Sequence, residues 1–138
     1  MNANNPVYQF IGFKLLEAKL SRNTDGQLTS FSIQVNNNNY DKEQKICNSF
    51  TVVKLNFKGC EESKFTFLSG YKINDEEWFA NLETENKNSI FLSVIFPFIR
   101  EKIRNICDDS RGSFVMPIID LRGLKLEHEI VFNIQKNK

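Results

Sequence analysis

In its last third the chain reads Phe96-Pro97-Phe98-Ile99-Arg100-Glu101. Large apolar residues recur through and around this stretch at intervals of three and four, and charged residues fall between them. The apolar positions are Ile90, Phe91, Val94, Ile95, Phe98, Ile99, Ile103 and Ile106. This spacing predicts a helix over about residues 86–110 with one broad apolar face, which another layer of structure must cover.

Proline and glycine residues mark the middle and the end of this helix. Pro97 removes one backbone hydrogen bond, at a cost of about 3 kcal/mol in an exposed helix interior, so the helix either restarts there or is held in a kink by packing. Gly112 follows the basic residue Arg111, and glycine accepts the left-handed backbone that ends many helices. We therefore expect the chain to leave the helix near Gly112 and to continue as an apolar segment.

Three runs of alternating apolar and polar residues upstream of the helix predict β-strands. They cover residues 29–35, 50–57 and 65–73. The last two runs are separated by a turn at residues 59–63, which predicts an antiparallel hairpin. Such strands expose one face to water, and the long helix is the element available to cover the other.

Three other segments are less regular. Residues 7–20 are compatible with a strand or with a short helix, and the asparagine run 36–39 predicts a break in regular structure. Near the C-terminus, Ile130, Phe132 and Ile134 alternate as in a strand, whereas Leu126, Ile130 and Ile134 share one side of a helix.

Length and charge limit the class of protein. A chain of 138 residues with 41% hydrophobic content fits one domain spanning residues 1–138. The net charge of +1 gives no sign of the clustered basic excess that is typical of nucleic-acid-binding proteins. The longest apolar run, residues 90–99, is shorter than the roughly 20 residues that span a bilayer, and residues 1–6 lack the features of a signal peptide. We expect a cytoplasmic protein with no nucleic-acid partner and no membrane insertion.

The cysteine and histidine residues do not match a known catalytic or metal-binding pattern. Cys47, Cys60 and Cys107 have the spacing of neither a zinc knuckle nor a CxxC pair, and His128 is the only histidine. The chain also lacks a Gly-rich phosphate-binding loop. We expect no catalytic residues, no metal, no cofactor and no enzyme activity. A cysteine-dependent enzyme is the alternative, and it requires one thiol that reacts fast near neutral pH.

Phenylalanine is unusually abundant, with 13 residues spread along the chain. A monomer of this size buries so many large rings with difficulty. We expect some of them in subunit interfaces or on a binding surface.

The helix and the segment after it resemble the SecB family of export chaperones. In that family a long helix carries a Phe-Pro-aromatic-x-Arg-Glu run, ends at Arg-Gly-x-Phe, and continues into an apolar segment with a proline. The matching residues here are Phe96, Pro97, Phe98, Arg100, Glu101, Ile103, Arg111, Gly112 and Phe114. The resemblance implies an α+β fold, in which a four-stranded antiparallel meander is covered by the long helix. It also favours a strand at residues 7–20 and a short C-terminal helix.

A SecB-like protein would be an ATP-independent chaperone, a holdase, for unfolded polypeptides or preproteins. Such a protein offers apolar area and strand edges to its clients. The resemblance implies a homotetramer that is a dimer of dimers, with sheet edges paired within dimers and helices packed between them. One branch of the family serves antitoxins, and the export branch docks on the motor ATPase SecA through negative sheet residues. The near-neutral charge of this chain argues against SecA as a partner.

Five residues are candidates for a peptide-binding groove. Tyr40 and Ile46 lie in the central connection, and Phe114, Met116 and Ile118 lie in the apolar segment after the helix. That segment is too apolar for an ordinary loop, and Pro117 disfavours a place inside the sheet. Packing in the core is the competing interpretation for each residue. The competing function is a small-molecule-binding α+β domain with an aromatic pocket.

Overall fold

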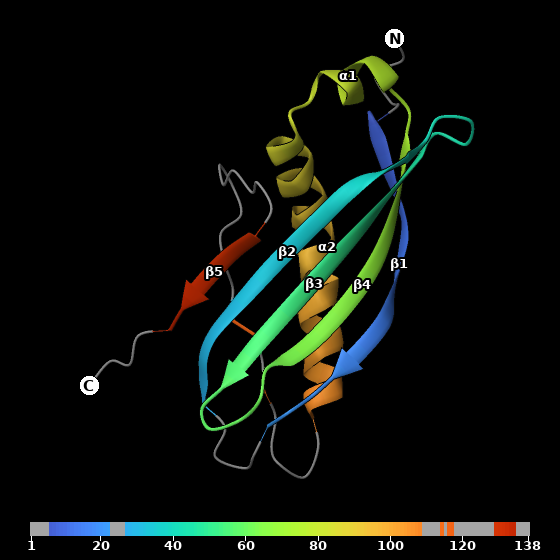
Figure 1. Cartoon of the computed structure of the whole chain (residues 1–138). Helices are drawn as coiled ribbons and strands as arrows, with labels where there is room; N and C mark the ends of the chain where they lie inside the picture. The colour runs from blue at the N-terminus through green and yellow to red at the C-terminus, as the bar shows by residue number, and fades with distance from the viewer. Residues whose placement is uncertain (1–5, 23–26, 109–113, 115, 118–128, 135–138) are drawn as a thin grey trace.

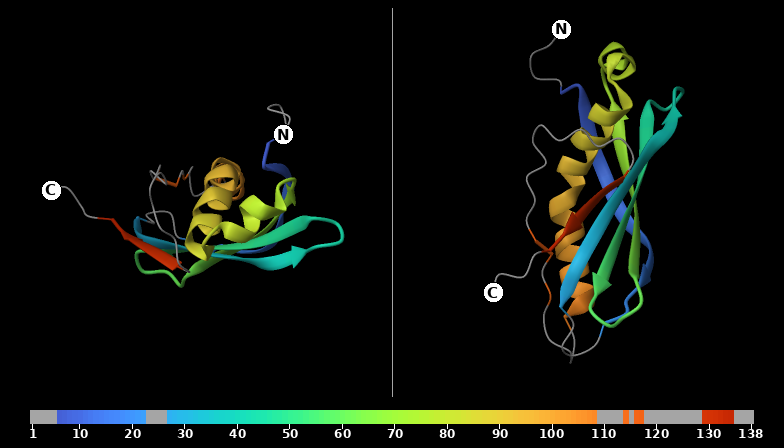
Figure 2. Two further views of the ribbon diagram at one scale, coloured as in Figure 1. Left: turned by 90° about the horizontal axis from the view of Figure 1, so that it is seen from above. Right: turned by 60° about the vertical axis from the view of Figure 1, so that its left-hand side comes forward.

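The computed structural model describes residues 6–22, 27–108, 114, 116–117 and 129–134, and these form two layers, a sheet with helices on one face (Figures 1 and 2). In chain order the elements are β1 (Tyr8–Lys19), β2 (Leu28–Asp41), β3 (Ile46–Phe57), β4 (Ser63–Ile73), α1 (Glu76–Asn81), α2 (Thr84–Cys107) and β5 (Glu129–Asn133). The strand order is β1-β4-β3-β2-β5, and neighbouring strands are antiparallel. Helix α2 covers one face, and we call the opposite face, which is turned to the viewer in Figure 1, the outer face.

The alternating sequence of the central strands sets the two faces of the sheet. Along β3, every second residue from Cys47 to Phe57 is buried beneath α2, and the residues between them are half-buried on the outer face. Strand β4 alternates in the same way. The predicted antiparallel sheet and long covering helix are therefore confirmed, as is the strand predicted at the N-terminus.

The predicted four-stranded meander is wrong in strand number and in order. Strands β2, β3 and β4 do form a meander, but β1 pairs with β4 and not with β2. The described residues include a fifth strand, β5, on the other side of β2. Alternation within a run predicts a strand but carries no information about its neighbour, which depends on contacts between distant segments.

The predicted short C-terminal helix is wrong at residues 129–133, which are extended and form strand β5. The unpaired edge of β2 supplies hydrogen-bond partners from Ser30 to Gln34. In this register Ile130 and Phe132 pack against the core, and the Phe132 ring stacks on Phe31 with centroids 4.7 Å apart. The tail thus gains both ladder hydrogen bonds and aromatic burial as a strand.

The asparagine run does not break regular structure as predicted, because β2 continues through residues 36–39 to Asp41. The pairing of β2 with β3 shifts register between Asn36 and Asn39, so the run is accommodated within the strand. Pairing then resumes, with Tyr40 opposite Cys47. The predicted helix cap at Gly112 lies outside the described residues.

Helix α2 is rotated slightly from the predicted apolar face. Its buried residues are Asn88, Phe91, Leu92, Ile95, Phe96, Ile99, Ile103 and Cys107. Phe96 is therefore in the core, whereas Phe98 is 45% exposed, stacks on Phe10 of β1 and makes a tilted ring contact with Phe13. Pro97 lies within the helix on its exposed side, and the helix continues through it.

The phenylalanine rings are buried more completely than the length of the chain suggested. Seven are buried within the single chain: Phe31, Phe57, Phe65, Phe67, Phe79, Phe91 and Phe96. Only Phe98 is exposed. Layering of a long helix on a twisted sheet provides this volume, so the number of rings alone does not require an interface.

Candidate binding surfaces

Tyr40 lies at the end of β2, where the strand passes beneath α1. Its ring centroid is 4.8 Å from that of Phe79 in α1, and its hydroxyl donates a hydrogen bond to Oε1 of Glu76 at 3.1 Å. Helix α1 is fixed in turn by Asp75, whose side chain accepts a hydrogen bond from the Trp78 backbone N–H at 2.9 Å. This N-cap holds the partners of Tyr40 in place.

A surface pocket of about 360 Å³ adjoins Tyr40 and opens to solvent. Its floor is the Phe79 ring, and its walls come from the β2–β3 turn, α1 and the first turn of α2. The lining residues are Tyr40, Lys42, Glu76, Phe79, Ala80 and Lys87. The Lys87 ammonium lies 4.2 Å from the Phe79 ring centroid, a cation–π distance. This pocket combines an aromatic floor with charged groups at its rim.

Ile46 does not share this pocket. It is the first residue of β3, and its alternation with the buried Cys47 places it half-buried on the outer face. Tyr40 is opposite Cys47 on the covered face. The sheet therefore separates two residues that the sequence analysis assigned to one groove.

Phe114 and Met116 lie at the other end of α2, which is about 36 Å long at 1.5 Å per residue. Phe114 is half-buried, and its ring meets Phe57 edge to face at 5.1 Å. Met116 is only 1% exposed, and its carbonyl accepts hydrogen bonds from Nε and Nη2 of Arg100 at 3.1 and 2.9 Å. The expected exposure of Met116 is therefore wrong, because Arg100 holds this segment against the core. Ile118 lies outside the described residues.

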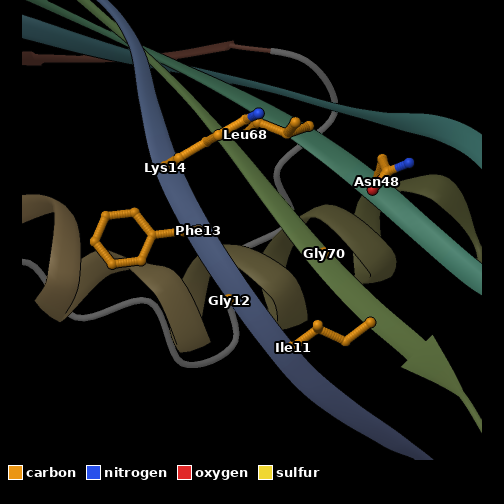
Figure 3. Close-up of a pocket in the computed structure, with 7 residues that line it drawn as sticks. All are labelled: Ile11, Gly12, Phe13, Lys14, Asn48, Leu68 and Gly70. Atoms are coloured by element: carbon orange, nitrogen blue, oxygen red, sulfur yellow. The ribbon is translucent and has the colours of Figure 1, made fainter.

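A second depression, which the sequence did not indicate, lies on the outer face where β1 meets β4 (Figure 3). It has a volume of about 230 Å³ and is open to solvent. Gly12 and Gly70 are register partners at its centre, so no side chain fills the sheet surface there. Ile11, 57% exposed, borders it, and the Lys14 side chain runs toward Leu68, whereas Phe13 points away toward α2. A pair of glycines facing each other across strands can be found only when the register is known.

Strand β1 forms one edge of the sheet and is interrupted twice. Its register with β4 shifts between Phe10 and Gly12 and again between Leu15 and Glu17. The residues at these two bulges, Ile11 and Leu16, are 57% and 47% exposed. Bulges bend an edge strand and re-aim its side chains, so this edge presents apolar groups to solvent.

The described residues offer little for covalent or metal chemistry. Burial raises the pKa of the Cys47 thiol to about 11, against a smaller lowering by the Lys87 ammonium, so the thiol is protonated at neutral pH. Cys107 is also buried, and Cys60 is half-buried. Among the residues that the structure covers, no group of three His, Cys, Asp or Glu side chains could hold a metal ion, and neither helix is long and apolar enough to cross a membrane.

Comparisons with known proteins connect this chain to one solved structure. Neither the protein-family models nor the curated proteins give a match. Among solved structures, the chain is similar to the SecB-like chaperone of Mycobacterium tuberculosis, solved in complex with a ChAD peptide from an antitoxin. The TM-score is 0.54 at 13% sequence identity, over 82% of this chain and 91% of that chain. At this identity, the likeness establishes a shared fold.

Proposed function

We propose that this protein is an ATP-independent holdase chaperone that binds unfolded polypeptide segments, with antitoxins among its clients, and that it acts in the cytoplasm. The observation that carries the proposal is the shared fold with a chaperone that was solved holding an antitoxin peptide. A holdase needs apolar area accessible to many sequences and needs no reactive groups. The open pocket beside Tyr40 and the half-buried ring of Phe114 fit that requirement.

Two surfaces at opposite ends of α2 suit an extended client. At one end the pocket beside Tyr40 provides an aromatic floor, and at the other end Phe114 is half-buried over Phe57. An extended chain covers about 3.3 Å per residue, so a segment of about 11 residues would span the length of α2. Two modest sites joined by one client reinforce each other through effective concentration.

Delivery of preproteins to SecA is not part of the proposal. The exporters of the SecB family are expected to dock through negative residues of the sheet. In this chain the outer face carries Lys54, Lys64 and Lys72 on its central strands, and its glutamates, Glu17 and Glu129, are confined to the edge strands.

The test is suppression of aggregation of a reduced, unfolded protein, measured by light scattering with and without the chain. We expect wild type to suppress aggregation, Tyr40→Ala and Phe114→Asp to weaken the effect, and the conservative variants Tyr40→Phe and Phe114→Leu to retain it. Circular dichroism on the same samples establishes that each variant is folded. Failure of folded wild type to suppress aggregation, or to bind an unfolded client at all, would overturn the proposal.

A small-molecule-binding role is the second candidate, and the pocket beside Tyr40 favours it. Its volume of about 360 Å³ lies at the lower end of the range typical of ligand pockets, and it mixes aromatic and charged groups. This role predicts that a small ligand raises the thermal midpoint of wild type but not of Tyr40→Ala. A holdase without such a ligand predicts capture of unfolded chains with no thermal shift.

A further inference from the structure

The outer face of the sheet carries a row of three lysines. The register places Lys19 of β1 opposite Lys64 of β4, and Lys64 opposite Lys54 of β3. Directly opposed side chains in neighbouring strands have Cβ atoms about 4.5–5.5 Å apart, and like charges in such positions repel each other. The sheet therefore brings three cations together on adjacent strands.

Little negative charge offsets this row. Lys19 forms an exposed ion pair with Glu61 at 3.6 Å, whereas Lys54 and Lys64 have no ion pair within the described residues. The next row along the face has Glu17 at one edge of the sheet and Glu129 at the other, and Glu129 accepts a hydrogen bond from Gln34 at 2.8 Å. The face keeps an excess of positive charge.

Apolar side chains lie on the same face, two rows along the strands from the lysine row, with the row of Glu17, Thr66 and Val52 between them. Leu68 of β4 is opposite Phe50 of β3, with Lys14 of β1 on its other side, and all three are on the outer face. Next to them is the depression centred on Gly12 and Gly70 (Figure 3). A site of about 230 Å³ can receive one apolar side chain, while Lys14 at its border and Lys72, two residues from Gly70 on the same face, attract carboxylates beside it. The lysine row lies six residues from Gly70 along β4, about 20 Å away, where it can attract carboxylates further along the same extended segment.

We propose that the outer face docks an acidic polypeptide segment, with one of its apolar side chains seated in the depression between Gly12 and Gly70. Charge complementarity selects an acidic partner, and the apolar centre selects a polypeptide over a nucleic acid, whose phosphates would use only the lysines. The surfaces proposed for clients, around Tyr40 and Phe114, belong to the side of the sheet that carries the helices. The docking site is therefore independent of the proposed chaperone function.

The first experiment uses the wild-type chain and fluorescence anisotropy with four labelled probes. These are an acidic peptide of glutamates around a central leucine, the same peptide with serine for leucine, the same peptide with lysine for every glutamate, and single-stranded DNA of similar length. We expect the leucine-containing acidic peptide to bind about tenfold more tightly than each of the others, and to weaken as salt is added. Equal binding of the serine peptide or of DNA would reduce the site to a non-specific polyanion surface and would overturn the proposal.

Two variants then test the charges and the depression separately. The double substitution Lys54→Gln, Lys64→Gln removes two cations of the row, and the double substitution Lys45→Gln, Lys102→Gln is its matched control at exposed positions elsewhere. Gly70→Ala places a methyl group in the depression, where a Cβ would lie 3.7 Å from Oδ1 of Asn48 and 3.9 Å from Cβ of Ile11, so the fold tolerates it.

We expect the double variant Lys54→Gln, Lys64→Gln and the single variant Gly70→Ala each to lower the affinity for the acidic peptide about tenfold. The control double variant should bind the peptide as wild type does. Suppression of aggregation should stay unchanged in all of them, which separates this site from the client surfaces. Wild-type affinity in either test variant would overturn the proposal. A change of oligomeric mass in Lys54→Gln, Lys64→Gln would assign the face to a second copy of the chain and would also overturn it.

Discussion

At the scale of single residues, Lys64 lies between two like charges in the sheet ladder. Replacing it by glutamate changes two repulsive cross-strand pairs, with Lys19 and Lys54, into attractive ones. We expect Lys64→Glu to raise the free energy of unfolding by about 0.2–1 kcal/mol at low salt, and less at high salt. Urea unfolding measures the change.

The control for this prediction is Lys45→Glu, which makes the same change of net charge at the exposed β2–β3 turn. If Lys64→Glu is no more stable than Lys45→Glu, the lysine row causes no local repulsion. Together with the docking proposal, the prediction implies that one substitution stabilises the fold and weakens binding of the acidic peptide. That combination is typical of a residue kept for function at a cost in stability.

Met116 and Phe114 are two positions apart, but charge should affect them differently. Met116 is buried in the core, and its carbonyl accepts two hydrogen bonds from Arg100. Phe114 is only half-buried. We expect Met116→Asp to lower the free energy of unfolding by several kcal/mol, because it buries a carboxylate without a partner. Met116→Leu should cost less than about 1.5 kcal/mol. Thermal unfolding followed by circular dichroism distinguishes these results, and a fully stable Met116→Asp would mean that this residue is exposed in solution.

At the scale of elements, Pro97 tests whether α2 is a continuous helix. The residue is on the exposed side, and the helix runs through it from Thr84 to Cys107. We expect Pro97→Ala to keep the fold and to change the free energy of unfolding by no more than about 1 kcal/mol, because the regained hydrogen bond is offset by a more flexible unfolded chain.

The matched experiment is Lys102→Pro, which introduces a second proline at an exposed position inside α2. It should cost about 3 kcal/mol. Urea unfolding of both variants gives the comparison. Loss of structure in Pro97→Ala, or a harmless Lys102→Pro, would contradict a continuous helix held by its buried face.

The elements that were predicted correctly are those whose signal is local. Alternation identified β2, β3 and β4, and intervals of three and four identified α2, because each pattern reports one face of one element. The neighbours of β1 and β5 could not be predicted in this way. The predicted inward face of α2 is also wrong at Phe98, whose ring contacts are with Phe10 and Phe13 of β1, a strand more than 80 residues away in sequence.

The candidate groove was predicted less well for the same reason. Tyr40 does border a pocket, but its partners Phe79 and Lys87 come from helices that are distant in sequence. Ile46 lies on the outer face of the sheet, opposite to the face that carries Tyr40. Met116 is held in the core by the hydrogen bonds from Arg100 to its carbonyl. The lysine row and the paired glycines exist only once β1 is placed beside β4. Local patterns predict an element, whereas a surface depends on which elements meet.

At the scale of the whole molecule, the edge strand β1 is the surface through which copies of the chain are expected to assemble. Because most phenylalanine rings are buried within one chain, the expectation of a homotetramer rests on the resemblance of residues 96–114 to the SecB family and on β1, an edge strand of the sheet that the described residues form. That edge exposes Ile11 and Leu16 at its two bulges. Bulges in an edge strand discourage pairing with the strands of other proteins. A second copy of this chain carries the same bulges, so two β1 edges can pair with each other about a two-fold axis.

We therefore predict a homotetramer of about four times 16.1 kDa, in which Leu16→Lys lowers the mass to that of a dimer. A lysine at this position places two charges near the two-fold axis of paired β1 edges, whereas contacts made through the helices would remain. Val131→Lys is the matched control, because Val131 is 56% exposed on β5 at the opposite edge of the sheet. Light scattering at micromolar concentration gives the mass of each protein. A monomeric wild type would refute the tetramer, and an unchanged mass in Leu16→Lys with a reduced mass in Val131→Lys would move the paired edge from β1 to β5.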